Sequence, residues 1–398
     1  MLLTLFFIRQ VLSVQDIIDQ LAHAIREAAN HQTPLRIRGG GTKDFYGGPL
    51  RGETLDTAAY RGVIEYEPTE LVLTARAGTP LAEIDEALRE KGQMLAFEPP
   101  HFGSLPSPLA PPPLKGVLYG VPGTGEGNVV SAAPKMGMAT LGGCIAAGLS
   151  GPRRAYTGAV RDLVLGVRML DGKGSDLRFG GRVMKNVAGY DLSRLMAGSL
   201  GTFGVILEVS LKTLPLPAAE FTLRREQTSA EAIALMNEWA GKPLPLSATC
   251  HIDNQLYVRL SGAVAAVRAA REKLGGEEVA DGTAFWRDLR EQQLDFFRQS
   301  QPLWRLSLKS TTPPLNLPGR QLLEWGGALR WLKSDADAET VRKAAAHGGG
   351  HATLFRGGDK TSGVFHPLPP VLMRLHQRLK QSFDPAGILN PGRMYPNY

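Results

Sequence analysis

Residues 180–212 read GGRVMKNVAGYDLSRLMAGSLGTFGVILEVSLK and end in an alternating, mostly apolar run over 205–212. That run predicts a β-strand. The glycines at 198–204 indicate that the backbone either approaches a neighbouring group closely or needs positive φ. A bulged strand with tight turns fits the same pattern. Glycine-rich segments elsewhere in the chain decide between these interpretations.

The composition indicates an ordinary globular protein. At 398 residues the chain is long enough for two or three domains. Its hydrophobic content of 43% and charged content of 21% are typical of such proteins. The net charge of +7 arises from 45 basic and 38 acidic residues scattered along the sequence, which favours a solvated surface. Nucleic-acid binding remains a distant alternative, because the sequence has no recognised motif for it.

Only two cysteines occur, Cys144 and Cys250. They fit a reducing compartment and exclude a disulfide framework or a cysteine-rich metal site. Residues 1–12 begin with an apolar run that lacks a basic leader and a cleavage site and is too short to span a bilayer. A strand, a membrane-surface contact and a misassigned start residue all fit it. We expect a cytoplasmic protein, with at most peripheral association at the inner face of the cytoplasmic membrane.

Two further segments are rich in small residues. A short strand over 35–38 runs into Gly39-Gly40-Gly41-Thr42-Lys43, whose unhindered N–H groups have the geometry that cradles a phosphate. The segment lacks the Walker A and G-x-G-x-x-G spacings, so a plain loop remains an alternative. Residues 139–148, ATLGGCIAAG, predict a helix of very small residues. Such a helix allows close approach to a flat ligand or simply packs tightly on a neighbour.

Several motifs occur in an order that carries a family resemblance. They are the glycine loop 39–43, EPPHFG (98–103), ATLGGCIAAGLSGPRR (139–154), GAVRDLVLGVRML (158–170), VMKNVAGYDLSRLMAGSLGTFGVILEVSLK (183–212) and FDPAGILNPGRMY (383–395). From about Thr33 to its end, the chain resembles the vanillyl-alcohol-oxidase (PCMH-type) FAD-binding proteins. More narrowly, it resembles the FAD-binding subunits of bacterial glycolate oxidase (glycolate dehydrogenase) complexes.

The resemblance implies an α+β fold with FAD between two subdomains. We expect a two-subdomain PCMH-type FAD-binding domain over 1–215, followed by a ferredoxin-like α+β cap or substrate domain over 216–398. The tail 384–398 would return to the FAD-binding domain. Residues 104–138 depart from the family as a proline- and glycine-rich insertion, which predicts an irregular loop.

The resemblance also implies the residues that contact FAD. Carried over by position, they are Gly39, Gly40, Gly41, Thr42, Lys43, Pro100, Thr140, Gly142, Gly143, Gly148, Gly158, Lys185, Gly201, Gly204, Val205 and Ile206. Asn186 joins Lys185 as a candidate for orienting flavin or substrate. Covalently flavinylated relatives commonly place a histidine in the first glycine loop. This loop has none, so we predict non-covalent FAD.

Oxidation of a 2-hydroxy acid needs a cationic clamp for the carboxylate and a base for the hydroxyl proton. Candidate clamps are Arg305 and Arg330, and candidate bases are His351 and His101. A surface arginine or a packed histidine is the alternative for each. Asn390, in the returning tail, is expected near the flavin ring. We expect no metal site, since His347 and His351 lie on a glycine-rich run without a rigid helix face.

We therefore expect an FAD-dependent oxidoreductase subunit that oxidises glycolate, or a similar small 2-hydroxy acid, to glyoxylate within a hetero-oligomer. The partners would be a second FAD-containing catalytic subunit and an iron–sulfur subunit, since two cysteines cannot hold a cluster. The alternative is a non-catalytic flavin-binding scaffold that stabilises a separate catalytic subunit. The segment 347–353 favours this alternative, because it lacks the acidic residue and the second histidine spacing of the catalytic sister subunit.

Overall fold

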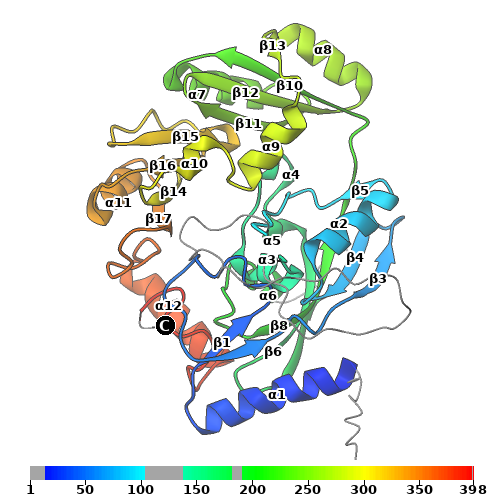
Figure 1. Ribbon diagram of the computed structural model, residues 1–398, viewed down its shortest axis with the longest axis vertical. Coiled ribbons are helices and arrows are strands. Elements are labelled where there is room, and N and C mark those ends of the chain that lie inside the picture. The colour runs from blue at the N-terminus through cyan, green and yellow to red at the C-terminus, as the bar shows by residue number, and fades with distance from the viewer. Residues whose placement is uncertain (1–13, 104–137, 182–190, 397) are drawn as a thin grey trace, which may run out of the picture.

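The computed structural model describes residues 14–103, 138–181, 191–396 and 398, and the structural statements below concern this part of the chain. Its strands form a five-stranded and an eight-stranded sheet, which occupy the lower and upper parts of Figure 1. Helices flank both sheets, so the predicted α+β class is confirmed. Apart from Met138, the predicted insertion 104–138 lies outside the described residues, as do Lys185 and Asn186.

The described chain begins with a helix and a small parallel sheet. Helix α1 (Val14–Asn30) has apolar residues at helical spacing and buries Ile18 and Ile25 among others. Strand β1 (Leu35–Arg38) pairs in parallel with β2 (Glu53–Asp56). This helix and this sheet share one apolar core with residues of the five-stranded sheet, so the two layers form one body.

The five-stranded sheet is antiparallel and is built around the strand predicted over 205–212. In spatial order its strands are β3 (Val63–Glu67), β4 (Val72–Arg76), β8 (Val205–Lys212), β6 (Val164–Leu170) and β7 (Asp176–Gly180). The central strand β8 is buried over most of its length, which explains why its sequence is nearly continuous in apolar residues. The remaining elements of this part are α2 (Leu81–Glu90), β5 (Gln93–Met94), α3 (Leu141–Ala147), α4 (Arg154–Thr157), α5 (Val160–Leu163), α6 (Leu192–Leu195) and β9 (Leu214–Pro215).

The eight-stranded sheet consists of two ferredoxin-like halves joined edge to edge. Its order is β13-β10-β12-β11-β15-β16-β14-β17, and each half has the spatial order 4-1-3-2 of a split βαβ unit. The first half comprises β10 (Ala219–Glu226), α7 (Ser229–Ala240), β11 (Leu246–Ile252), β12 (Gln255–Gly262), α8 (Val264–Leu274) and β13 (Glu277–Glu278). The second comprises β14 (Leu303–Ser307), β15 (Arg320–Glu324), the 3₁₀ turn η1 (Trp325–Gly327), β16 (Leu329–Lys333), α11 (Ala338–His347) and β17 (His351–Arg356). Residues 308–319 form a loop where the second half would otherwise have its first helix. The ferredoxin-like prediction for the cap is thus confirmed, in doubled form.

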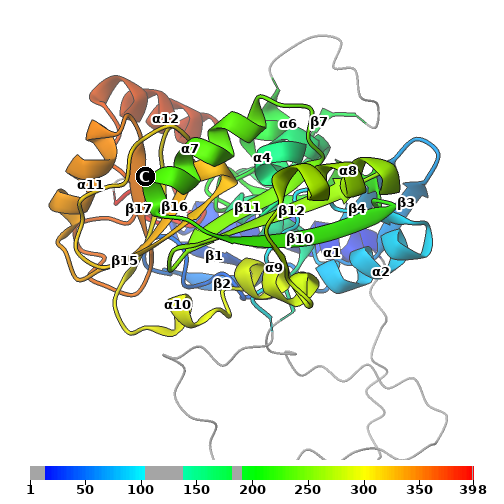
Figure 2. The same cartoon turned by 90° about the horizontal axis from the view of Figure 1, so that it is seen from above.

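The two faces of this sheet bury different partners (Figure 2). Helices α7, α8 and α11 cover one face. The other face packs on α9 (Gly282–Arg290), on α10 (Asp295–Arg298) and on residues of the N-terminal part such as Ala147 and Leu200. A positive φ at Gln292 separates α9 from α10.

The C-terminal segment returns to the N-terminal part, and the return begins before residue 384. Helix α12 (Pro370–Phe383) already places Phe383 in the core of the five-stranded sheet. Leu389 then forms a parallel bridge with Leu35 of β1. The division of the chain at residue 215 stays a prediction. Among the described helices, none combines the length and the apolar character needed to cross a membrane.

Candidate functional site

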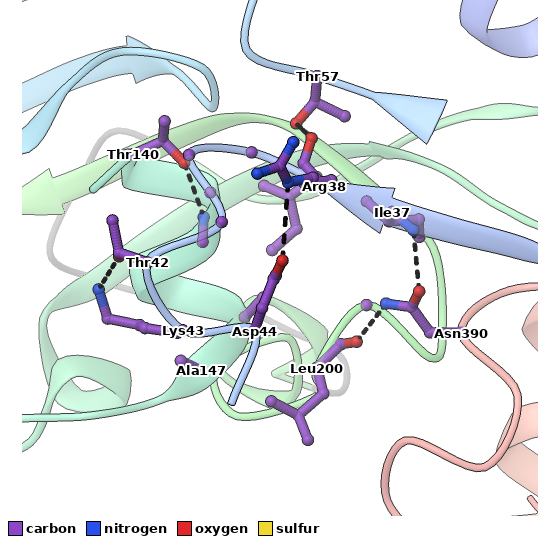
Figure 3. Close-up of a pocket in the computed structure, with 18 of the residues that line it drawn as sticks. Ile37, Arg38, Thr42, Lys43, Asp44, Thr57, Thr140, Ala147, Leu200 and Asn390 are labelled. Atoms are coloured by element: carbon purple, nitrogen blue, oxygen red, sulfur yellow. Dashed lines mark hydrogen bonds and ion pairs between the residues drawn. The ribbon is translucent and has the colours of Figure 1, made fainter. Parts of the chain in front are cut away.

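A cavity lies where four glycine-rich or tail segments meet (Figure 3). The first glycine loop, α3, the approach to β8 and the returning tail each contribute to its wall. Its lining residues are Ile37, Arg38, Gly39, Gly40, Gly41, Thr42, Lys43, Asp44, Leu50, Thr57, Thr140, Gly142, Gly143, Ala146, Ala147, Leu200, Gly201, Gly204, Ile206, Asn390 and Arg393. The structure therefore brings together three segments that the sequence suggested separately.

The glycine loop has the features of a phosphate-binding loop. A Cβ on Gly39 would overlap the Thr140 side chain, and one on Gly40 would overlap the carbonyl of Met138. Gly41 has φ 73°, which only glycine adopts readily. Within the described residues, the N–H groups of 39–43 donate to no protein acceptor. A row of free backbone donors fits the diphosphate of FAD.

Helix α3 combines tight packing with an open side. A Cβ on Gly142 would lie 2.7 Å from Cβ of Ala77, and one on Gly148, with φ 66°, would lie 2.7 Å from Cα of Gly198. These two glycines serve close packing, which was the alternative reading of this helix. Gly143, in contrast, has no backbone contact of that kind. Gly142 and Gly143 both line the cavity. Thr140 caps the helix by accepting the Gly143 N–H at 3.4 Å.

The approach to β8 supplies the opposite wall. Gly201, at φ 71°, would place a Cβ 2.8 Å from Nδ2 of Asn390, so no side chain fits there. Gly204 and Ile206 also line the cavity. Val205 is fully buried in the core that α1 covers and lies outside the lining. The alternation of the strand places Ile206, and not Val205, on the cavity side.

Asn390 connects two walls of the cavity. Its Oδ1 accepts the N–H of Ile37 at 2.8 Å, and its Nδ2 donates to the carbonyl of Leu200 at 2.7 Å. Both bonds are drawn in Figure 3. Nearby, the Arg393 guanidinium donates to the carbonyls of Tyr46 and Gly48. The tail thus holds the glycine loop in place, a positioning role for Asn390.

Lys43 brings a positive charge to the cavity. Its Nζ lies 3.3 Å from Oγ1 of Thr42 and 5.5 Å from the centre of the Phe102 ring. Burial lowers the pKa of Lys43, and the nearby Cys144 and Glu291 partly oppose this shift. An anionic group in the cavity would stabilise this ammonium.

Other predicted contact residues lie outside this lining. Pro100 is buried in the loop that precedes His101, and Gly158 ends α4 with φ 94°. Nε2 of His101 lies 3.2 Å from Oδ2 of Asp85, and the backbone N–H of His101 donates to the carboxylate of Glu291. The FAD contacts predicted for Pro100 and Gly158 are therefore not supported by the cavity geometry.

The two candidate clamps lie on opposite faces of the cap sheet. Arg305 pairs with Trp331 across β14 and β16, whereas Arg330 pairs with Leu306, one residue out of phase. The buried Arg330 guanidinium donates to the carbonyls of Gly327, Pro313 and Thr312. Burial also lowers the pKa of Arg330 to about 10. This geometry does not support the clamp role predicted for Arg330.

His351 lies opposite Ser307 at the exposed start of β17. Burial, Arg305 and His366 all lower the pKa of His351, which keeps the imidazole neutral and able to accept a proton. His351 does not line the cavity. Its role as a base therefore stays a prediction. Within the described residues, no group of three or more histidine, cysteine or carboxylate side chains could hold a metal ion.

A second cluster, which the sequence reasoning did not find, lies at the contact between α4 and η1. Arg154 and Arg305 both lie against the Trp325 ring, and the preceding Glu324 is buried. The signals were present as the GPRR motif and as the Trp-Gly-Gly turn after β15. Neither signal shows that the two segments meet.

Comparisons with known proteins agree with this architecture. Residues 11–105 match the family described as "FAD binding domain", and residues 357–394 match "FAD linked oxidases, C-terminal domain". The fold is similar to that of a solved alkyldihydroxyacetonephosphate synthase, with a TM-score of 0.59 at 14% identity, covering 94% of this chain and 75% of that chain.

Two curated relatives are glycolate oxidase subunits. The chain is 28% identical over 232 residues to glycolate oxidase subunit GlcD of Bacillus subtilis (strain 168), covering 57% of this chain and 42% of that protein. It is 50% identical over 375 residues to glycolate oxidase subunit GlcE of Escherichia coli (strain K12), covering 94% of this chain and 96% of that protein. With this identity over nearly the whole length, and with a glycine-lined cavity suited to FAD, the chain belongs to the family of FAD-binding glycolate oxidase subunits.

Proposed function

We propose that this chain is the FAD-binding subunit of a glycolate oxidase (glycolate dehydrogenase) complex and oxidises glycolate, or a similar small 2-hydroxy acid, to glyoxylate or the matching 2-oxo acid. The observation that carries the proposal is the row of N–H groups over 39–43 that donate to no acceptor among the described residues, in a chain that is 50% identical to a glycolate oxidase subunit. The glycine loop contains no histidine, so the flavin is bound non-covalently.

In this proposal, residues of the glycine loop bind FAD, and residues of the cap bind and deprotonate the substrate. The glycine loop would hold the diphosphate through backbone N–H groups, and Lys43 would add a nearby positive charge. When bound, FAD supplies the acceptor for a hydride from the alcohol carbon. Arg305 would orient the substrate carboxylate, and His351 would take the hydroxyl proton. Asn390 holds two walls of the cavity together through its hydrogen bonds to Ile37 and Leu200.

The electrons would then pass to a partner with an iron–sulfur cluster. This chain has only Cys144 and Cys250, both buried in separate cores, and a cluster needs about four cysteine ligands. A second FAD-containing catalytic subunit would complete the complex.

One observation favours a second function, a flavin-binding scaffold without its own catalysis. Among the described residues that line the cavity there is no histidine, and the single carboxylate, Asp44, is engaged by Arg36 and Arg38. A base would therefore have to come from the cap or from another subunit.

The visible absorption spectrum of the purified protein, before and after anaerobic addition of glycolate, tests both functions. We expect an oxidised-flavin band that glycolate bleaches. A bound flavin that glycolate leaves oxidised would support the scaffold. Protein that binds no flavin after reconstitution would refute both. Acid precipitation should release the flavin into the supernatant if the binding is non-covalent.

A matched pair of variants tests the glycine loop. Gly40→Ala should abolish flavin retention, because its Cβ would overlap the carbonyl of Met138. Gly241→Ala is the control, since the nearest atom to its Cβ lies 3.6 Å away in the cap. Equal flavin retention by the two variants would contradict the assignment of this loop.

A further inference from the structure

The turn between β15 and β16 holds a bulky residue in an unfavourable backbone conformation. Trp325 has φ 54°, and Gly326 and Gly327 follow at φ 68° and 93°. Glycine adopts positive φ freely, whereas tryptophan rarely does. The indole N–H donates to the carbonyl of Gly151 at 3.0 Å, which ties the cap to the N-terminal part. Strained residues of this kind concentrate at functional sites.

Two arginines from different parts of the chain lie against this indole. Cζ of Arg154, from α4, is 4.5 Å from the ring centre, and Cζ of Arg305, from β14, is 5.2 Å from it. Neither guanidinium forms an ion pair or a hydrogen bond with another described residue. Burial lowers the pKa of Arg154, and the positive charge of Arg305 lowers it further. Asp162 raises the pKa of Arg154 and so partly opposes these shifts. Within the described residues, two like charges thus lie against one indole with no carboxylate in ion-pair contact with either.

The neighbouring arginines show that this lack of neutralisation is selective. Arg153, next to Arg154 in the sequence, is paired with Glu98 and Glu220. Arg259 is likewise paired with Glu98 at 2.8 Å. Arginines that only join the two parts are thus neutralised here, while the pair on Trp325 is not.

The cluster lies close to the flavin cavity. Trp325 shares an apolar core with Ala147 and Leu200, and both of these residues also line the cavity. Tyr46, just after the glycine loop, belongs to the same core and feels the charge of Arg305. A small anion held by the two guanidinium groups would therefore lie near the cavity, at the boundary between the two parts.

We propose that Arg154 and Arg305, supported by Trp325, form the carboxylate-binding site for a small 2-hydroxy acid. The proposal rests on the proposed function and adds Arg154 and Trp325, from both sides of the boundary, to the binding machinery. Two guanidinium forks match the planar geometry of a carboxylate and supply donors in its plane.

Glu324 links this site to pH. It is 5% exposed, and its Oε1 accepts the indole N–H of Trp331 at 2.7 Å. Burial raises its pKa to about 7, Arg305 opposes that shift and Glu98 adds to it. The thiol of Cys250 lies opposite Glu324 in the sheet, and burial raises its pKa well above its usual value. Above about pH 7, ionised Glu324 competes for Arg305, so carboxylate affinity falls as the pH rises.

Isothermal titration calorimetry on the FAD-loaded protein tests the site. The probe is 2-hydroxy-2-methylpropanoate, which has no hydrogen on the alcohol carbon and so cannot be oxidised, and the control ligand is its uncharged amide. We expect Arg154→Gln and Arg305→Gln each to weaken binding of the acid at least tenfold. Arg305→Lys, which keeps the charge and loses the fork, should recover part of the affinity. Arg374→Gln, on the exposed surface of α12, is the matched control and should bind normally.

The pH dependence of binding distinguishes a binding role for these residues from a purely structural one, which would not change it. Affinity for the acid should be higher at pH 6 than at pH 8, and Glu324→Gln should remove that difference. Equal binding of acid and amide, or normal binding by both glutamine variants, would overturn the proposal even if glycolate bleaches the flavin. Retention of flavin by the variants shows that they are folded. Failure of the unaltered protein to bind flavin would instead refute the proposed function.

Discussion

Replacing Asn390 by alanine should open the glycine-lined cavity, where we propose that FAD binds, at one defined place, because this side chain joins two of its walls. Asn390 is 7% exposed, and its amide bonds the N–H of Ile37 at 2.8 Å and the carbonyl of Leu200 at 2.7 Å. Alanine removes both partners at once. Ile37 and Leu200 are then left with backbone groups that bulk water reaches poorly.

The size of the effect follows from these two bonds. Each buried backbone group without a partner costs about 1–3 kcal/mol, and partial relaxation recovers some of the total. Asn390 also has φ 44°, a left-handed conformation that asparagine tolerates better than alanine. We expect a local destabilisation of about 2–4 kcal/mol, which raises the local opening constant by about 30- to 1,000-fold.

Hydrogen exchange measured by mass spectrometry on the FAD-loaded protein would detect this opening. The peptide that contains Ile37 should lose protection, and the retained flavin should decrease. Asn254→Ala is the matched control. Asn254 has φ 58° in the exposed β11–β12 turn, and its side chain bonds no other described residue.

The comparison between these two variants can refute the reasoning. If protection at Ile37 were the same in Asn390→Ala and in the unaltered protein, the two side-chain bonds would not stabilise the loop. If Asn254→Ala lost flavin equally, the effect would come from backbone conformation and not from the amide.

Three further changes test the buried charges. Lys380→Met leaves Asp384 buried without its partner, because Nζ of Lys380 lies 2.7 Å from Oδ2 of Asp384. We expect the free energy of unfolding to fall by about 3–5 kcal/mol, measured by thermal unfolding; an unchanged melting temperature would contradict this. Burial would raise the pKa of Glu98, but Arg259 and Arg153 hold this pKa below its usual value of 4.5. The ionised Glu98 therefore stabilises the fold above about pH 4.5, and this stabilisation is lost as the pH falls through the pKa of Glu98 in the folded state. Glu98→Gln should therefore flatten the acid limb of urea unfolding curves recorded from pH 3 to 7. Burial raises the pKa of Glu324 from 4.5 to about 7, so the folded state binds the proton more tightly and stability falls as the pH rises between these values. Glu324→Gln should remove this fall, about 3 kcal/mol at pH 8, and should leave stability at pH 4 unchanged.

The parts of the site that could be predicted from sequence are those in which local chemistry decides the structure. The loop over 39–43 follows a strand and contains glycines that tolerate both crowding and positive φ, so its role could be inferred from spacing. The strand over 205–212 has an apolar pattern that requires burial on both faces. The tail was placed by family resemblance, since nothing in its own residues indicates the bridge between Leu389 and Leu35.

The parts that could not be predicted depend on register and on contacts between distant segments. Arg305 and Arg330 looked equivalent, because each lies in an alternating strand. In the pairing of β14 with β16, Arg330 lies opposite Leu306, the residue after Arg305, so Arg305 and Arg330 point to opposite faces of the sheet. Arg154 and Trp325 are 171 positions apart, and no local pattern states that α4 lies against η1. The missed cluster is therefore the part of the site that exists only after the cap has docked.

The contact between the cap and the N-terminal part explains which arginines are paired with carboxylates. Glu98 lies in the N-terminal part and holds Arg153 beside it and Arg259 of the cap, so one carboxylate fixes the two parts against each other. The same docking brings Arg305 over Trp325 toward Arg154. An interface shaped for stability alone would neutralise all four arginines, because unpaired like charges oppose association. Within the described residues, Arg154 and Arg305 are the pair without a carboxylate in ion-pair contact, and we propose that an anionic substrate supplies the missing charge there.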